Sequence, residues 1–170
     1  EGVFYGESAN DYSGSSVSFN EDATIMAIGA YRNGDNGQYS GHVRVYQLLN
    51  DSWTQLGLDI EGEVANDYFG RSVSLSSDGT ILAIGAYAND GNGNASGHVR
   101  VYQFSNDSWS QLGADIDGEA QGDQSGYSVS LSSDGKTVAI GAYSNDSNGT
   151  ASGHVRVYQF SNDSWSQLGS

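Results

Sequence analysis

Residues 97–103 read Gly-His-Val-Arg-Val-Tyr-Gln, and the same heptapeptide begins again at Gly41 and at Gly153. A second motif, Ala-Ile-Gly-Ala-Tyr, follows the same spacing of 56 residues and begins at Ala27, Ala83 and Ala139. A fixed internal period of this kind is the sequence signature of repeat architectures. The chain therefore consists of three copies of one unit, and the fold of the unit decides the fold of the whole.

The third copy shows the secondary structure of the unit most clearly. Apolar and small polar residues alternate, and β-branched and aromatic residues are enriched, whereas no stretch has the 3.6-residue period of a helix. The expected strands of this copy are residues 127–132, 137–143, 153–160 and 164–168. Short Asp/Gly and Asn/Asp turns join the first strand to the second and the third to the fourth, so we expect antiparallel hairpins.

Four antiparallel strands repeated at this period are typical of the blades of a β-propeller. We therefore predict an all-β chain with three four-stranded antiparallel blades. The expected boundaries are 1–57 for blade 1 with an N-terminal linker, 58–113 for blade 2 and 114–170 for blade 3. Propellers typically have about 4–8 blades, so three blades form one incomplete propeller.

The composition excludes several functional classes. With 21 acidic and 6 basic residues the net charge is −15, which disfavours binding to nucleic acid and to anionic membrane surfaces. Cysteine is absent, which excludes disulfides and thiolate metal sites. No apolar run reaches the roughly 20 residues that a spanning helix needs, so we expect no membrane insertion.

The second copy resembles the FG-GAP repeat family, which is best known from the propeller of integrin alpha subunits and occurs in many secreted bacterial and algal proteins. The residues that carry the resemblance are Phe69-Gly70, Ser72–Leu75, Ala83–Tyr87 and Gly97–Tyr102. The resemblance implies an extracellular location, secreted or at the cell surface. It also implies a non-enzymatic role in adhesion or in binding a protein or glycan ligand.

The chain departs from the family in the calcium loop. Integrin blades carry this loop between the FG strand and the GAP strand, whereas here the connection is only Ser-Ser-Asp-Gly, or Asn20-Glu21-Asp22-Ala23 in the first copy. The integrin type of calcium site has no room in this connection. We therefore do not expect it in this chain.

Acidic residues gather instead in the long connections, which a four-stranded meander sends to one face. We call this the acidic long-loop face. Because carboxylates with a nearby glycine are typical of calcium loops, calcium is the one candidate cofactor. The candidate calcium ligands are Asp59, Glu61, Glu63, Asp67, Asp115, Asp117, Glu119 and Asp123. The alternative is that Asp, Asn and Gly serve ordinary turns and an acidic rim keeps the protein soluble.

One histidine and one arginine recur at fixed positions of each copy: His42, His98 and His154, with Arg44, Arg100 and Arg156. Because each histidine belongs to a different blade, we expect packing or hydrogen bonding within the blade rather than a shared metal. Each arginine is expected to pair with an acidic residue in or next to its own blade. Candidate partners are Asp22, Asp78 and Asp134.

No nucleophile elbow, phosphate loop or zinc pattern occurs, and every candidate catalytic residue is copied three times, so we predict that the chain is not an enzyme. Three Asn-x-Ser sequons, at Asn50, Asn106 and Asn162, fall on the predicted tip of the hairpin between the third and fourth strands. They are candidate glycosylation sites. The alternative is that Asn and Ser are simply frequent in this sequence.

An incomplete ring leaves two blade faces open, and soluble monomers rarely expose such apolar surface. The expected partners are therefore further blades, either from a longer chain or from another copy in a homo-oligomer. The start at Glu1 without an initiator Met favours a fragment or a processed product. The leading hypothesis is a binding or adhesion module that uses the acidic long-loop face. The alternative is a structural repeat that assembles through its blade faces into a ring or filament.

Overall fold

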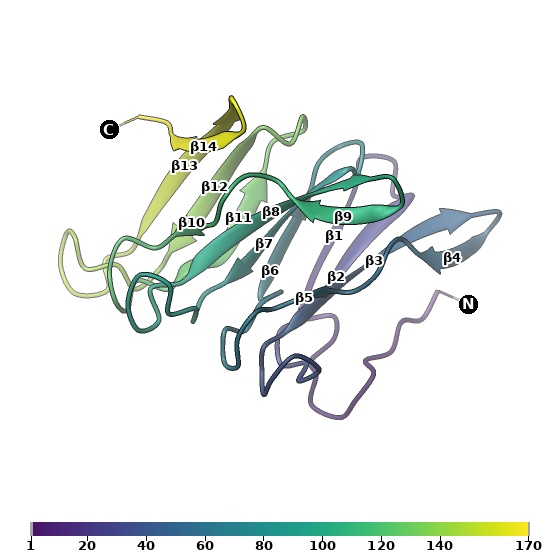
Figure 1. The fold of residues 1–170 in the computed structure, drawn as a ribbon, viewed down its shortest axis with the longest axis horizontal. Helices are drawn as coiled ribbons and strands as arrows, with labels where there is room; N and C mark the ends of the chain where they lie inside the picture. Colours follow the sequence, from purple (N-terminus) through teal and green to yellow (C-terminus); the bar gives the residue numbers. More distant parts are fainter. Residues whose placement is uncertain (1, 170) are drawn as a thin grey trace.

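The computed structural model of the chain describes residues 2–169, which form strands and loops. Three antiparallel sheets follow one another along the long axis of the molecule, one sheet for each copy of the repeat (Figure 1). The described residues contain no helix of the length and apolar character needed to cross a membrane. The all-β, three-blade prediction is confirmed.

The first four strands of each sheet lie side by side in sequence order, and in the first two sheets a fifth short strand pairs with the third. The first sheet contains β1 (Ser16–Phe19), β2 (Ile25–Ala30), β3 (His42–Leu49), β4 (Ser52–Gln55) and β5 (Ile60–Glu61). The second contains β6 (Ser72–Leu75), β7 (Ile81–Ala86), β8 (His98–Ser105), β9 (Ser108–Gln111) and β10 (Ile116–Asp117). The third contains β11 (Ser125–Leu131), β12 (Thr137–Ala142), β13 (His154–Ser161) and β14 (Ser164–Gln167).

The outer edge of a blade differs from the prediction, because it is built from two short strands. β4 pairs with the second half of β3, and β5 then pairs with the first half, where His42 faces Glu61 and Val43 faces Ile60. Since β3 has eight residues and β4 only four, the first half of β3 offers a free edge that β5 occupies. The predicted boundary after residue 57 places β5 in the second blade, whereas its pairing places it on the first. β10 pairs with β8 in the same way.

Type I′ turns close the hairpins between the third and fourth strands. Asn50 and Asp51 form the first of these turns with φ angles of 49° and 62°, and the same Asn-Asp pair recurs in the other two blades. Asparagine and aspartate tolerate positive φ better than other non-glycine residues, which explains why this dipeptide is repeated. The turns leave the three sequon asparagines exposed at the hairpin tips.

The cores lie between neighbouring blades, because both faces of the middle sheet are covered. Along β7, Leu82 and Ile84 pack toward the first blade, where they meet Val43 and Val45. The intervening residues, Ile81 among them, pack toward the third blade. All six residues of β7 are buried. This two-sided burial explains why the strand reads as a continuous apolar run rather than as an alternating one.

The glycines of the two family motifs allow neighbouring blades to approach closely. A Cβ atom on Gly85, the motif glycine of β7, would fall on the carbonyl oxygen of Gly126 in the next blade. Gly126 has a φ of 84°, and its carbonyl also accepts a hydrogen bond of 2.8 Å from Ser72 Oγ. Gly29 and Gly70 repeat this arrangement one blade earlier. Both motif glycines therefore serve the contact between blades.

Tryptophan fastens the outer edges of adjacent blades. Trp109 Nε1 of β9 donates a hydrogen bond of 2.9 Å to the carbonyl of Leu56, which follows the outer strand of the preceding blade. Trp165 makes the equivalent bond of 2.8 Å to Leu112. Each bond joins residues 53 positions apart, three fewer than the repeat period of 56, so the same contact recurs between each pair of neighbouring blades.

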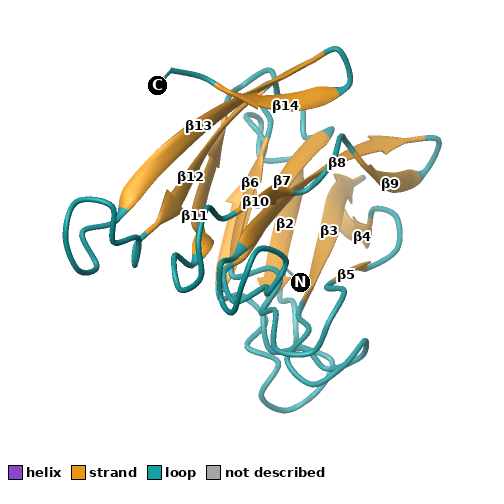
Figure 2. Ribbon diagram, turned by 60° about the vertical axis from the view of Figure 1, so that its left-hand side comes forward, coloured by secondary structure: helices purple, strands orange, loops and turns teal. Residues whose placement is uncertain are grey.

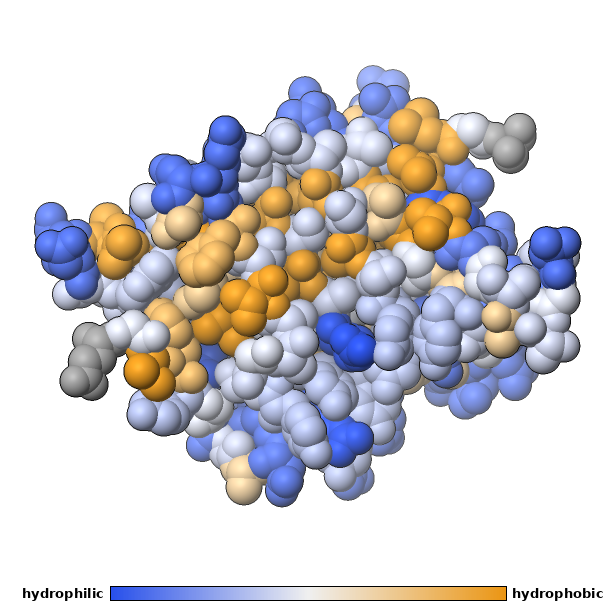
Figure 3. Space-filling view, turned by 180° about the vertical axis from the view of Figure 1, so that it is seen from behind, coloured by the Kyte–Doolittle hydropathy of each residue, from blue (hydrophilic) through white to orange (hydrophobic). Residues whose placement is uncertain are grey.

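The two terminal blades leave apolar side chains uncovered. Val17 and Phe19 of β1 are 50% and 49% exposed, whereas their counterparts in the second blade, Val73 and Leu75, are 9% and 7% exposed. At the other end Val155 of β13 is 67% exposed. Figure 3 shows apolar surface crossing one face of the molecule as a band with hydrophilic surface on both sides.

Candidate functional site

The long loops gather at one end of the strands, as Figure 2 shows. The connection between the second and third strands of a blade is tied there to the connection that enters the blade. In the second blade Asn89 Nδ2 donates a hydrogen bond of 2.9 Å to Asp67 Oδ2, and in the third blade Asn145 makes the same bond to Asp123. Both aspartates are buried. Their conserved geometry from blade to blade gives the loop end a fixed shape.

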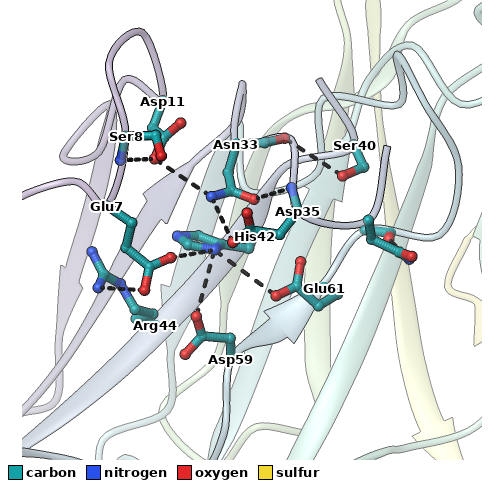
Figure 4. Close-up of polar contacts among 12 residues, drawn as sticks. Glu7, Ser8, Asp11, Asn33, Asp35, Ser40, His42, Arg44, Asp59 and Glu61 are labelled. Carbon is teal, nitrogen blue, oxygen red and sulfur yellow. Dashed lines mark hydrogen bonds and ion pairs between the residues drawn. The ribbon is translucent and has the colours of Figure 1, made fainter. Parts of the chain in front are cut away.

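Above this framework the first blade holds a histidine surrounded by carboxylates (Figure 4). The side chain of His42 is 1% exposed, and its Nδ1 lies 3.6 Å from Asp59, 3.8 Å from Glu7 and 4.0 Å from Glu61. The acidic residues come from the N-terminal segment, from the connection before β5 and from β5 itself. We call these four residues the blade 1 cluster.

Two further charged residues border the blade 1 cluster. Arg44 Nη1 lies 3.5 Å from Glu7 Oε1, and Arg44 Nη2 donates a hydrogen bond of 2.8 Å to the carbonyl of Tyr5. Asp35 lies on the other side: one of its carboxylate oxygens, a ring nitrogen of His42 and a carboxylate oxygen of Glu61 all lie within 4.8 Å of one another. Its own backbone N–H donates to Asn33 Oδ1. The cluster with its border therefore contains four carboxylates and one guanidinium group.

Crowding of like charges shifts the proton affinity of this cluster. Burial, with smaller contributions from the neighbouring carboxylates Asp59, Asp35 and Glu7, raises the pKa of Glu61 to about 7. Burial also lowers the pKa of His42, although the charge of Asp59 opposes the shift. A neutral imidazole beside several carboxylates is a ligand set for a cation.

The second blade arranges the same residue types as a salt-bridged cluster. Arg100 Nε and Nη2 donate hydrogen bonds of 3.0 and 2.9 Å to the two oxygens of Asp115, and Arg100 also pairs with Glu63. Burial alone raises the pKa of Asp115, but the bonds from Arg100 and Gln111 outweigh it and lower the pKa. His98 is 2% exposed, and burial with the charge of Arg100 lowers its pKa to about 4. We call His98, Arg100, Asp115 and Glu63 the blade 2 cluster.

The third blade contains a smaller version. His154 Nδ1 lies 3.8 Å from Glu119, whose other oxygen lies 3.5 Å from Arg156 Nη1. The guanidinium of Arg156 also donates a hydrogen bond of 2.7 Å to the carbonyl of Asp117 on β10. Within the described residues no segment after β14 pairs with β13, so no carboxylates corresponding to Asp115 and Asp117 approach this histidine.

The structure distributes the eight predicted calcium ligands among different environments. Asp59 and Glu61 lie at His42; Asp115, Asp117 and Glu63 lie at His98 and Arg100; Glu119 lies at His154; and Asp67 and Asp123 hold loops through Asn89 and Asn145. They do not form one common site. Calcium binding and glycosylation of the sequons both stay predictions.

The predicted partners of the arginines are wrong. The arginines pair with Glu7, with Asp115 and Glu63, and with Glu119, which belong to the connections before and after each blade. Asp78 instead accepts bonds from the Thr80 backbone N–H and from hydroxyl groups in its own turn. A four-residue turn saturates its aspartate locally, so that carboxylate is not free to reach β8.

The sequence did not predict that carboxylates gather around His42, nor that Glu7 and Asp35 are among them. One sequence signal could have identified Glu7. Glu7, Glu63 and Glu119 follow the same 56-residue spacing as the histidines and arginines, so each glutamate occupies the same place relative to its histidine. Asp35 has no such signal, since Gly91 and Ser147 stand at its equivalent positions.

A cleft of about 640 Å³ opens on the acidic long-loop face between the connection that enters the second blade and the loop that follows β7. Five carboxylates line it: Glu63, Asp67, Asp90, Asp115 and Asp117. Tyr68 and His98 contribute to the wall as well. No lysine or arginine is among the described residues that line the cleft, although Arg100 pairs with Glu63 and Asp115. Asp90 and Asp117 have no ion pair among the described residues, so the cleft has the character of a site for positively charged groups.

The FG-GAP repeat family matches residues 6–46, 61–102 and 114–158 of the chain. No curated protein matches the chain. Structural similarity extends to the β-propeller domain of Cps50 (Swd1) from Myceliophteria thermophila, with 12% identity, a TM-score of 0.54 and coverage of 92% of this chain and 38% of that chain.

Two further solved structures show the same likeness. A putative 6-phosphogluconolactonase from Bacteroides uniformis is 12% identical with a TM-score of 0.60 over 91% of this chain and 39% of its own. Sqt1 from Saccharomyces cerevisiae is 16% identical with a TM-score of 0.57 over 94% of this chain and 35% of its own. The chain thus spans well under half of each of these structures, and the likeness concerns the fold alone. Three matched repeats fall on three consecutive blades, and the chain therefore belongs to the FG-GAP repeat family and has the blade fold of a β-propeller.

Proposed function

We propose that the chain is an extracellular, non-enzymatic binding module that contacts its ligand through the acidic long-loop face. The observation that carries the proposal is the cleft of about 640 Å³ with five carboxylates in its walls. The family supports the extracellular location, because FG-GAP repeats are typical of extracellular proteins. One histidine, one arginine and one glutamate recur at equivalent positions of all three blades, which supports binding rather than turnover at a single site.

A partner protein that presents lysine or arginine side chains fits this cleft best. Asp90 and Asp117 are exposed at its rim, and Asp117 Oδ atoms have no hydrogen-bond donor among the described residues. Exposed carboxylates of this kind steer and orient cationic groups, and a net charge of −15 extends the same field beyond the cleft. A glycan ligand would depend less on these charges.

Neutralising the cleft tests the proposal. The double variant Asp90→Asn/Asp117→Asn is expected to weaken binding to Lys/Arg-rich peptides on an array by about tenfold or more, since two rim charges are removed. The matched control, Glu21→Gln/Asp107→Asn, removes two exposed charges from turns at the opposite end and is expected to stay within about twofold. Binding of neutral glycans alone, or equal loss in both double variants, contradicts the proposal.

The second candidate is a structural repeat that assembles through its blade faces. The exposed apolar residues Val17, Phe19 and Val155 favour it, because their counterparts in the other blades are covered by a neighbouring blade. The mass of the chain in solution distinguishes the candidates. Concentration-dependent dimers or longer assemblies that Phe19→Ser abolishes support assembly through the first blade face, and a monomer at all concentrations removes this candidate.

A further inference from the structure

His42 is a buried side chain whose Nδ1 atom has no hydrogen-bond partner among the described residues. Three carboxylates surround this nitrogen, yet the nearest oxygen, on Asp59, is 3.6 Å away. A protonated imidazole would donate a hydrogen bond to a carboxylate at about 2.7–2.9 Å. The spacing therefore does not correspond to an imidazolium paired with a carboxylate, and it leaves space between the nitrogen and the oxygens.

The nearest two carboxylates are held so that one oxygen of each remains directed at this space. Glu7 places Oε1 on Arg44 and turns Oε2 toward His42, and Asp59 accepts a bond from Gln55 on Oδ1 and turns Oδ2 toward His42. Second oxygens fixed by neighbouring donors are the usual way in which proteins orient metal-binding carboxylates. Figure 4 shows Glu7, Asp59 and Glu61 converging on the same imidazole nitrogen.

The distances suit a small divalent ion. Ligand atoms of Glu7, His42 and Asp59 all lie within 4.8 Å of one another. Two ligands that bind one tetrahedral zinc ion at about 2.1 Å lie about 3.4 Å apart, so the observed 3.6 and 3.8 Å require only a small adjustment of the side chains. Glu61 Oε1 lies 4.0 Å from the same nitrogen, and its Oε2 is buried without a partner in the described chain. One of its oxygens lies within 4.8 Å of atoms of His42 and Asp35, on a second side of the imidazole.

We propose that Glu7, His42 and Asp59 bind one divalent transition-metal ion of the class of zinc, with Glu61 as the next carboxylate beside it. The imidazole nitrogen favours such an ion over calcium and magnesium, which take oxygen ligands. The ion links the N-terminal segment to β3 and to the connection before β5 at the outer edge of the first blade. This site lies outside the ligand cleft, which residues of the second blade and its connections line, so the two proposals are independent.

Calorimetric titration of the metal-free chain with Zn²⁺ tests the site, with Ca²⁺ and Mg²⁺ as comparisons. We expect one Zn²⁺ per chain, Ca²⁺ binding at least about 100-fold weaker, and a rise of several degrees in Tm when Zn²⁺ is in excess. Co²⁺ in place of Zn²⁺ is expected to give visible absorption typical of a coordinated transition ion. None of these measurements depends on a peptide or glycan ligand.

Variants assign the ligands. Glu7→Gln, at an exposed position, and Asp59→Asn are each expected to lower Zn²⁺ affinity about tenfold or more, and His42→Gln is expected to lower it about 100-fold. The matched controls Glu119→Gln and His154→Gln in the third blade are expected to leave the affinity within about threefold. Since His42 is buried, circular dichroism checks the folding of its variant, and Glu7→Gln provides the test that does not disturb the core.

The outcomes separate cleanly. Absence of Zn²⁺ binding to the wild-type chain overturns the site, as does binding that Glu7→Gln and Asp59→Asn leave unchanged or that the third-blade controls remove equally. Ca²⁺ binding as tight as Zn²⁺ overturns the assignment of the ion class. Loss of Zn²⁺ binding in Glu7→Gln with unchanged binding of cationic peptides supports the metal site and leaves the proposed ligand cleft intact.

Discussion

The first and second blades place the same histidine, arginine and carboxylates at equivalent positions and obtain two different electrostatic arrangements. In the second blade Arg100 binds both oxygens of Asp115 and also pairs with Glu63, so the carboxylates are largely neutralised. In the first blade Arg44 pairs with Glu7, and Asp59 has no guanidinium partner among the described residues. The comparison teaches that the placement of one guanidinium decides whether these carboxylates form a closed salt bridge or stay gathered around the histidine.

The position of each blade in the row adds a second difference. The first blade has a neighbour on one side only, whereas the second has neighbours on both. Val73 and Leu75 are therefore buried at a position where Val17 and Phe19 are half exposed. Variants at equivalent positions of the two blades therefore separate two effects on stability and binding: the effect of the residue's place in the repeat and the effect of the neighbouring blades.

The largest expected effect concerns this burial. Leu75→Ala is expected to lower the free energy of unfolding by about 3–4 kcal/mol, because it opens a cavity between the first and second blades. Phe19→Ala, at the equivalent exposed position, is expected to cost less than about 1 kcal/mol in the monomer. Urea unfolding followed by circular dichroism measures both values. Equal losses would mean that something covers β1 in solution.

Removing the guanidinium of the second blade comes next. Arg100→Met is expected to lower the free energy of unfolding by about 2–3 kcal/mol, since Asp115 and Glu63 then lie side by side without a partner. Arg44→Met breaks a looser contact to the exposed Glu7 and the hydrogen bond to the Tyr5 carbonyl, and it is expected to cost less, about 1 kcal/mol. Urea unfolding at pH 7 distinguishes the two variants. Similar costs would contradict the contrast between a closed and an open cluster.

The buried histidine of the second blade predicts a pH effect. Its pKa is about 4 in the folded chain against an ordinary value of 6.5, so between these values the unfolded chain binds a proton that the folded chain does not. Its contribution to stability is complete above pH 6.5 and falls as the pH drops toward 4, with a loss of about 2 kcal/mol at pH 5.

The variant His98→Gln is therefore expected to lose less stability than the wild-type chain between pH 7 and pH 5. His154→Gln serves as the control, because this histidine is more exposed, and it is expected to follow the wild-type profile. Unfolding curves at a series of pH values give the slope for each chain. If His98→Gln loses as much stability as the wild-type chain between pH 7 and pH 5, another group causes the loss of stability in acid.

The smallest expected effect lies at a position where the two blades differ in sequence. Asp35→Gly gives the first blade the residue of the second and is expected to lower Zn²⁺ affinity about tenfold, since it removes one negative charge beside Glu61. The reciprocal Gly91→Asp is expected to create no second site while Arg100 holds Asp115. Calorimetric stoichiometry decides: two equal sites in Gly91→Asp would show that the guanidinium is not the controlling group.

The strands and the blade order were predictable from the sequence because the alternation of apolar residues and the Asn-Asp and Ser-Asp-Gly turns are local signals. The clusters at the histidines were not, because each combines residues from two or three separate segments. β5 illustrates the reason: two residues, Ile60 and Glu61, carry no strand pattern of their own and pair only because β4 leaves half of β3 free. Their pairing brings Asp59 and Glu61 to His42, which a linear reading of the acidic connection did not indicate.

The close approach of Gly85 to the carbonyl of Gly126 has a consequence for how such chains lengthen in evolution. Every unit presents the same glycine on one side and the same carbonyl on the other, so a unit inserted in frame by gene duplication meets neighbours that already fit it. A change in blade number by recombination would then need no new mutation at this contact. The loops carry no such constraint, and there the first blade has an aspartate where the second has a glycine.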